Sequence, residues 1–71
     1  MKVIYNDVEK VEQTGIIATV YPFPEMSEFS VAVYSGRYVD INGSAMMNPE
    51  SSREFADAIK AAADIAEGKR R

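Results

Sequence analysis

The chain has 71 residues, with 11 acidic against 8 basic side chains and a formal net charge of −3. It contains neither cysteine nor histidine, which excludes disulfides, the usual zinc clusters, and catalysis by a thiol or an imidazole. A chain of this length forms one domain at most and is marginally stable alone. We therefore expect a single domain over residues 1–71 that is stabilised as a homodimer.

Strand-forming residues fill the first part of the chain. Residues 3–13 are expected to form an irregular strand, and Thr14-Gly15 marks a turn. Residues 16–21 ("IIATVY") are β-branched and aromatic, which predicts a second strand. Its odd and even positions are both apolar, so we expect this strand to be covered on two sides or to meet another subunit.

A proline-rich loop follows at residues 22–28. Pro22 and Pro24 lack the backbone donors that a central strand needs, so the chain leaves the sheet here. The loop carries Phe23 and Met26, and exposed apolar loop residues sometimes mark a contact surface. The alternative is that Phe23 folds back over the edge of the core, since isolated apolar surface residues are common.

Residues 29–41 alternate in polarity around a glycine and predict a hairpin. Gly36 suits the third position of a loop Tyr34-Ser35-Gly36, which pairs Val33 with Arg37 and Val31 with Val39. A slip by one residue would mix polar and apolar side chains on both faces. The odd positions then form one apolar face: Phe29, Val31, Val33, Val39 and Ile41.

The even face of this hairpin is neither charged enough for an ordinary wet surface nor apolar enough for a core. It carries Ser30, Ala32, Tyr38, Asp40 and Asn42, with Tyr34 at the loop. Tyrosine has an apolar body and a wet tip, so Tyr34 and Tyr38 are candidates for a contact surface. The alternatives are a cross-strand ring contact without function and, for Asp40, an edge charge that blocks aggregation.

A helix is expected at residues 49–67, where Asn48 suits the N-cap, Pro49 the first position and Gly68 the position after the end. Residues 44–47 are a candidate fifth strand after the Asn42-Gly43 turn, with Met46 and Met47 as core filler. The helix has a wide, alanine-rich apolar arc. One sheet needs only part of it, which favours a second copy as the other neighbour.

These elements predict an α+β domain: an antiparallel meander of four strands, or five, over residues 2–47, with the helix packed across the odd face and a basic tail at 68–71. The chain shows no signal peptide and no stretch of about 20 apolar residues. A cytoplasmic protein without metal or cofactor is the plain expectation.

The residues expected to bind a protein partner or a small ligand are Tyr34, Tyr38, Asp40, Phe23, Met26 and Tyr21. Without histidine or cysteine we expect no enzyme, but a homo-oligomeric binding protein that acts by occupancy. Its size and acidity fit a small bacterial or phage accessory protein, including an inhibitor that competes with nucleic acid for a basic groove.

The alternative is single-stranded nucleic-acid binding across the tyrosine-bearing face, with phosphate contacts from Lys69, Arg70 and Arg71. The order of elements is similar to that of Whirly-type single-strand binders, although no sequence motif matches. A nucleic-acid binder is expected to carry a basic stripe on its working face, and the sequence has none outside the tail.

Overall fold

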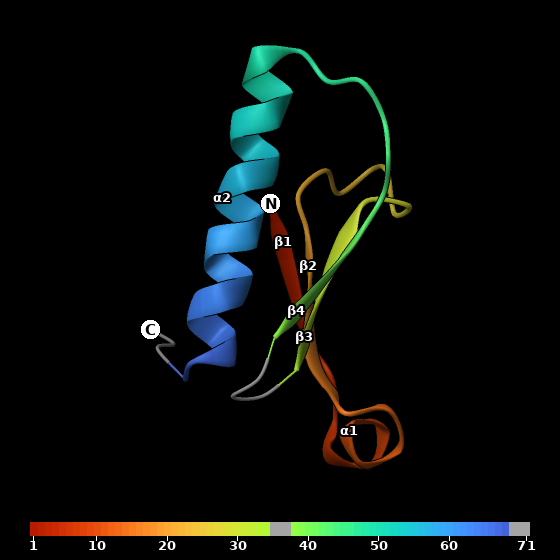
Figure 1. The fold of residues 1–71 in the computed structure, drawn as a ribbon. Coiled ribbons are helices and arrows are strands. Elements are labelled where there is room, and N and C mark those ends of the chain that lie inside the picture. Colours follow the sequence, from red (N-terminus) through yellow and green to blue (C-terminus); the bar gives the residue numbers. More distant parts are fainter. Residues whose placement is uncertain (35–37, 69–71) are drawn as a thin grey trace.

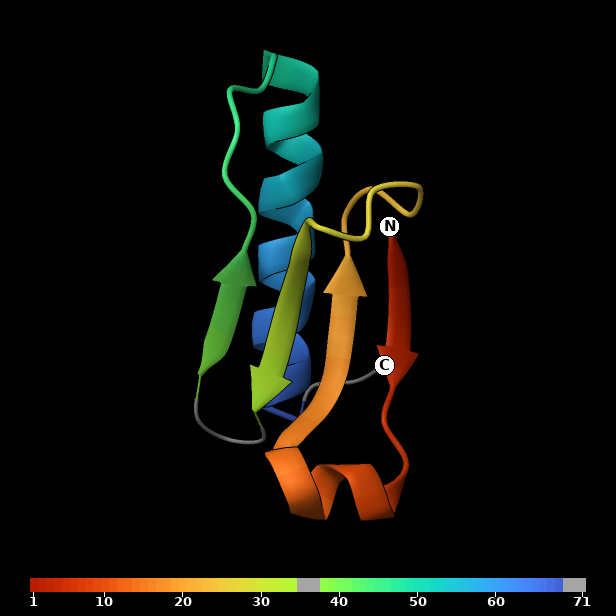
Figure 2. The same ribbon diagram turned by 90° about the vertical axis from the view of Figure 1, so that its right-hand side faces the viewer.

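The computed structural model describes residues 1–34 and 38–68 and shows an α+β fold, as the sequence predicts (Figure 1). Four antiparallel strands form one sheet in the order β1-β2-β3-β4, so the sheet is a meander. Helix α2 lies along one face, and Figure 2 shows the opposite face toward the viewer. The elements are β1 (Lys2–Tyr5), α1 (Val8–Thr14), β2 (Ile16–Tyr21), β3 (Ser30–Tyr34), β4 (Val39–Asn42) and α2 (Pro49–Ala66).

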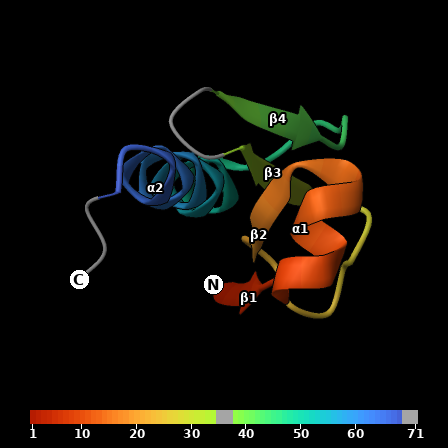
Figure 3. The same ribbon diagram turned by 90° about the horizontal axis from the view of Figure 1, so that it is seen from below.

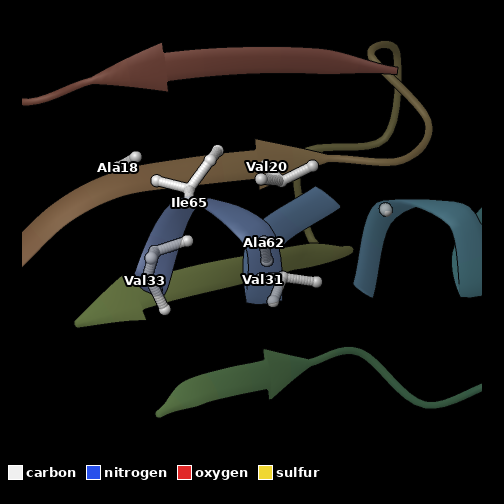
Figure 4. Packing of buried hydrophobic residues seen from close by; sticks show 8 residues of the cluster. Ala18, Val20, Val31, Val33, Ala62 and Ile65 are labelled. Carbon is white, nitrogen blue, oxygen red and sulfur yellow. The ribbon is translucent and has the colours of Figure 1, made fainter. Parts of the chain in front are cut away.

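The core fills the space between α2 and the two central strands. Val20 on β2 and Val31 and Val33 on β3 are fully buried, and Figure 4 shows them beneath Ala62 and Ile65 of α2. Because alanine has only a methyl group, the helix can lie close to the strands. Among the described residues, every buried side chain is apolar, so burial of hydrocarbon is the main source of stability.

The prediction that the odd positions of the hairpin lie under the helix is confirmed for Val31 and Val33, and Val39 packs against the same cluster. It is wrong for Ile41, which is 49% exposed although its cross-strand partner Val31 is fully buried. The reason is that α2 packs mainly on β2 and β3. Strand β4 is an edge strand, and α2 does not cover the part of it that contains Ile41.

The predicted hairpin register is wrong by two residues. Val33 pairs with Val39 and Val31 with Ile41, and the Tyr34 N–H donates to the Tyr38 carbonyl at 3.0 Å. A shift of two leaves every side chain on its predicted face, so the polarity pattern cannot detect it. The predicted loop residues Ser35 and Gly36, and also Arg37, lie outside the described residues.

The prediction of one strand over residues 3–13 is wrong, because β1 ends at Tyr5 and the short helix α1 follows. The Asp7 side chain caps α1 by accepting from the Lys10 N–H at 2.9 Å. At the other end Gly15, with φ of 80°, donates its N–H to the Val11 carbonyl. Helix α1 has no buried residue and lies at one end of the sheet, on the side away from α2 (Figure 3).

Helix α2 begins and ends nearly as predicted. The Asn48 side chain accepts from the Ser51 N–H at 2.8 Å, and Pro49 is the first helical residue. The helix ends at Ala66, one residue before the predicted end, and Gly68 follows with φ of 83°. Residues 44–47 do not form the fifth strand, so the sheet ends at Asn42 instead of continuing to residue 47.

Candidate functional site

The face of the sheet that α2 leaves uncovered is the candidate site (Figure 2). One row of cross-strand neighbours runs over it from edge to edge: Ile4, Thr19, Ala32 and Asp40. Ile4 on β1 is 43% exposed and Asp40 on β4 is exposed, whereas Ala32 in the middle is buried. The row is therefore buried at its centre and exposed at its ends.

Two tyrosines stand together at the end of this face. The ring centroids of Tyr34 and Tyr38 are 4.6 Å apart, with 35° between the ring planes. Tyr34 is half-buried and lies opposite Ile16 on β2, and its ring is next to Gly15, where an added Cβ atom would be 3.5 Å from Cδ1. Tyr38 is 56% exposed. One ring is thus held by the sheet and supports the second, which is available for contact.

Asp40 and Tyr21 share this face with the tyrosine pair. Asp40 is exposed on β4, two residues after Tyr38, and pairs with Ala32 across the strands. Tyr21 is half-buried at the opposite end of the sheet, where it pairs with Lys2. The structure therefore groups Tyr34, Tyr38 and Asp40, which we call the tyrosine surface, and places Tyr21 apart from it.

Phe23 does not belong to the tyrosine surface. Its ring meets Phe29 edge-to-face at 5.6 Å between centroids and lies 6.2 Å from Phe55 of α2. Phe29 and Phe55 are themselves 6.1 Å apart, so the three rings close the core at the loop end of the molecule. Of the two alternatives for Phe23, the structure therefore has the one in which the ring folds back over the core.

Met26 lies at the same end, in a surface hollow that sequence reasoning missed. The hollow has a volume of about 210 Å³ and is lined by Phe23, Met26, Phe29, Ala45, Met46, Met47, Asn48 and Ser51. The prediction that the two adjacent methionines fill the core is wrong, since Met46 is exposed and Met47 is half-buried. Two methionines directly before a helix cap were the only signal, and local sequence does not say which side they face.

A second hollow, of about 380 Å³, lies on the other side of Phe23. It is lined by Met1, Pro22, Phe23, Pro24, Glu25, Glu54 and Asp57. Its carboxylates come from the loop and from one flank of α2. No described group of histidine, cysteine, aspartate or glutamate side chains is arranged to hold a metal ion.

The tyrosine surface can offer apolar contact, ring stacking and hydrogen bonds from hydroxyl and carboxylate groups. Acidic side chains of the neighbouring α1, such as Glu9 and Glu12, add negative charge at the same end of the sheet. Lys69, Arg70 and Arg71 lie outside the described residues. None of the described helices has both the length and the apolar character needed to cross a membrane.

Comparison with known proteins found no matching family model and no similar curated protein or solved structure.

Proposed function

We propose that this chain is a non-catalytic binding protein that acts by occupying a protein partner, with the tyrosine surface as its contact. The observation that carries the proposal is the stack of Tyr38 on Tyr34, at 4.6 Å between ring centroids, on a sheet face that no described element covers. A supported, half-exposed tyrosine is typical of the residues that dominate binding energy at interfaces, because few rotamers are lost when it is buried.

The sizes of the side chains along the uncovered sheet face support the proposal that the partner is a protein. Short side chains, Thr19 and Ala32, occupy the middle of the cross-strand row, and the larger Ile4 stands at its β1 end. A side chain of a partner can pack against these short side chains, between Ile4 and the residues of β4. Tyr38 and Asp40 then contact it from the β4 side.

The charge of the same region indicates the chemistry of the partner. Asp40 lies on the face, and Glu9 and Glu12 lie on α1 at the same end of the sheet. Complementary charge raises the rate and the specificity of association. We therefore propose a partner with basic side chains around an apolar contact. This fits an accessory protein of a bacterium or phage that covers a basic, nucleic-acid-binding groove of an enzyme.

Affinity capture from a bacterial lysate tests this proposal. We expect a protein that is retained by the wild type and lost with Tyr38→Ala, and we expect the purified partner to bind the variant about 30-fold more weakly, as for a hot-spot residue. Met46→Ala is the matched control, because Met46 is fully exposed but lies at the other end of the molecule. Equal binding by wild type and Tyr38→Ala would show that the tyrosine surface is not the contact.

Single-stranded nucleic acid is the second candidate, because the exposed ring of Tyr38 is also a stacking platform for a base. A labelled oligothymidylate titrated at about 20 and 200 mM salt separates the two. Binding that weakens steeply with salt and is lost with Tyr38→Ala would favour nucleic acid. No binding at low salt removes this candidate and leaves the protein partner.

A further inference from the structure

The outer edge of β4 presents backbone hydrogen-bonding groups that pair with none of the described strands. The Tyr34 N–H donates to the Tyr38 carbonyl, and Ala32 pairs with Asp40, two residues further along each strand. In an antiparallel ladder, hydrogen-bonded pairs recur at every second residue. The backbone N–H and C=O groups of Val39 and Ile41 therefore point away from β3. Among the described strands none pairs with this edge, which is a template for another strand.

The flank of α2 above this edge is uncharged. Glu54 and Asp57 share a hollow with Met1 at the start of β1, so the acidic flank of the helix faces the β1 side. The opposite flank faces β4. At helical spacing it carries small and apolar residues: Ser52, Ala56, Ile59 and Ala63.

The exposed side chain of Ile41 continues this flank as one apolar strip. Ile41 is on the helix side of β4 because its cross-strand partner Val31 is in the core. Ile59 and Val39 are half-buried and pack at the margin of the same cluster. An open strand edge and an apolar strip thus lie along the same border of the molecule.

We propose that a second copy of this chain covers this border, with the two β4 strands pairing antiparallel to join the two four-stranded sheets into one. The β4 edge is compatible with antiparallel pairing to the same edge of a second copy. When Ile41 pairs with Ile41 of the second copy, Asp40 stands opposite Asn42 and not opposite another Asp40, which would be unfavourable. Pairing through β1 is disfavoured, because it would bring the acidic flanks of the two α2 helices, with Glu54 and Asp57, toward each other.

The contacts in this dimer differ from the helix-to-helix contact that the sequence suggests. Helix α2 packs mainly on β2 and β3, so the two helices would lie about three to five strand spacings apart, roughly 15–25 Å. Direct helix packing needs about 8–10 Å. Backbone hydrogen bonds and the side chains of Ile41 and Ile59 therefore hold the dimer. Such an interface is small, and we expect dissociation constants on the order of micromolar.

The dimer would also affect binding of a partner, if the tyrosine surface is the contact, as proposed above. A twofold axis perpendicular to the sheet places both α2 helices on one side and both tyrosine surfaces on the other. The dimer then offers two Tyr38 rings to one partner or to two, so that binding gains from avidity without new contacts.

The experiment is sedimentation equilibrium of the purified chain from about 5 to 500 μM, with no partner present. The average mass is expected to rise toward twice the 7.9 kDa of the chain. Ile41→Lys places a charge in the strip, and Ile41→Pro removes the outward N–H without touching the ladder to β3. Both are expected to remain monomers with an unchanged circular dichroism spectrum. Ile4→Lys, on the other edge strand, and Tyr38→Ala are controls that are expected to dimerise.

A wild type that stays monomeric up to 500 μM overturns the proposal, as does a dimer that both Ile41 variants leave intact. If those variants unfold, the sedimentation mass and the hydrogen exchange of the wild-type chain test the proposal. Protection of the Ile41 amide against hydrogen exchange is expected to increase with protein concentration, and a constant value contradicts the pairing. The sedimentation experiment contains no partner, so a monomeric result would not contradict the role of the tyrosine surface in partner binding. Conversely, a failure to bind a partner would not contradict the dimer.

Discussion

Replacing Gly43 by alanine tests how the segment between β4 and α2 is seated on the core. Gly43 has φ of 118°, where side chains are rarely tolerated. A Cβ atom at this position would lie 2.5 Å from Cδ1 of Phe29, whose ring is held by Phe23 and Phe55. Gly43→Ala therefore strains the backbone and also displaces a buried ring.

The two costs can be estimated separately. The backbone conformation costs about 1–3 kcal/mol in a residue other than glycine. Moving Phe29 weakens ring contacts that are worth about 0.5–1.5 kcal/mol each. The sum is about 2–4 kcal/mol, against a total stability of roughly 4–11 kcal/mol for a chain of this length. We expect Gly43→Ala to remove about half of the free energy of unfolding.

Urea unfolding followed by circular dichroism measures this loss, in trimethylamine oxide if the variant is unfolded in buffer. The slope for a small domain is about 1 kcal/mol per molar urea, so the midpoint should fall by about 2–4 M. The matched control is Gly68→Ala: Gly68 has φ of 83° with no atom within 4 Å of the added Cβ, so that only the backbone cost of about 1–2 kcal/mol applies.

A double-mutant cycle isolates the ring contact. In a Phe29→Leu background the added methyl group meets a smaller, more flexible side chain, so Gly43→Ala should cost only the backbone strain of about 1–3 kcal/mol. Equal losses for Gly43→Ala and Gly68→Ala in the wild-type background, or no coupling between Gly43 and Phe29, would refute the reasoning.

Two further predictions concern the core and the short helix. Val31→Ala should cost about 1–3 kcal/mol, because a fully buried side chain leaves a cavity, whereas Val8→Ala at a 74% exposed position should change stability by less than about 0.5 kcal/mol; urea midpoints check both. Asp7→Ala should raise hydrogen exchange at the Lys10 amide about fivefold, the loss of a cap worth about 1 kcal/mol, with little change in the global urea midpoint, because α1 buries no residue. Unchanged exchange at Lys10, or a large fall in the midpoint, would show that α1 is stabilised in another way.

The tyrosine surface was partly visible in the sequence. The alternation along residues 29–41 places Tyr38 and Asp40 on the face opposite Val31, and the structure has them there. The contact between the Tyr34 and Tyr38 rings was one of the alternatives that the sequence left open, and the structure has it. That the two residues lie directly opposite each other was not predicted, because the predicted register differs by two residues. The position of Phe23 away from this surface was not determined by the sequence, since its ring packs against Phe29 and against Phe55 of the distant helix α2.

Interactions between residues near each other in the sequence determined where α2 begins and ends. They also determined which face of the sheet each strand side chain lies on. The cap at Asn48, the proline after it and the glycine at residue 68 act on their immediate neighbours, and alternation acts along a single strand, so both can be read from the sequence. Asp7 and Gly15 carried the same kind of signal for α1, but the β-branched and aromatic residues before them favoured a strand over the whole segment.

What only the tertiary structure decided is which parts of these elements stay uncovered. Ile41 and Val31 are equally apolar and share a face, yet only Val31 is buried, because the width and position of α2 leave the β4 border open. Sequence alternation assigns a side chain to a face, and that is a property of one strand. Whether the face is covered at that point depends on where a distant helix ends up, which is a property of the whole packing.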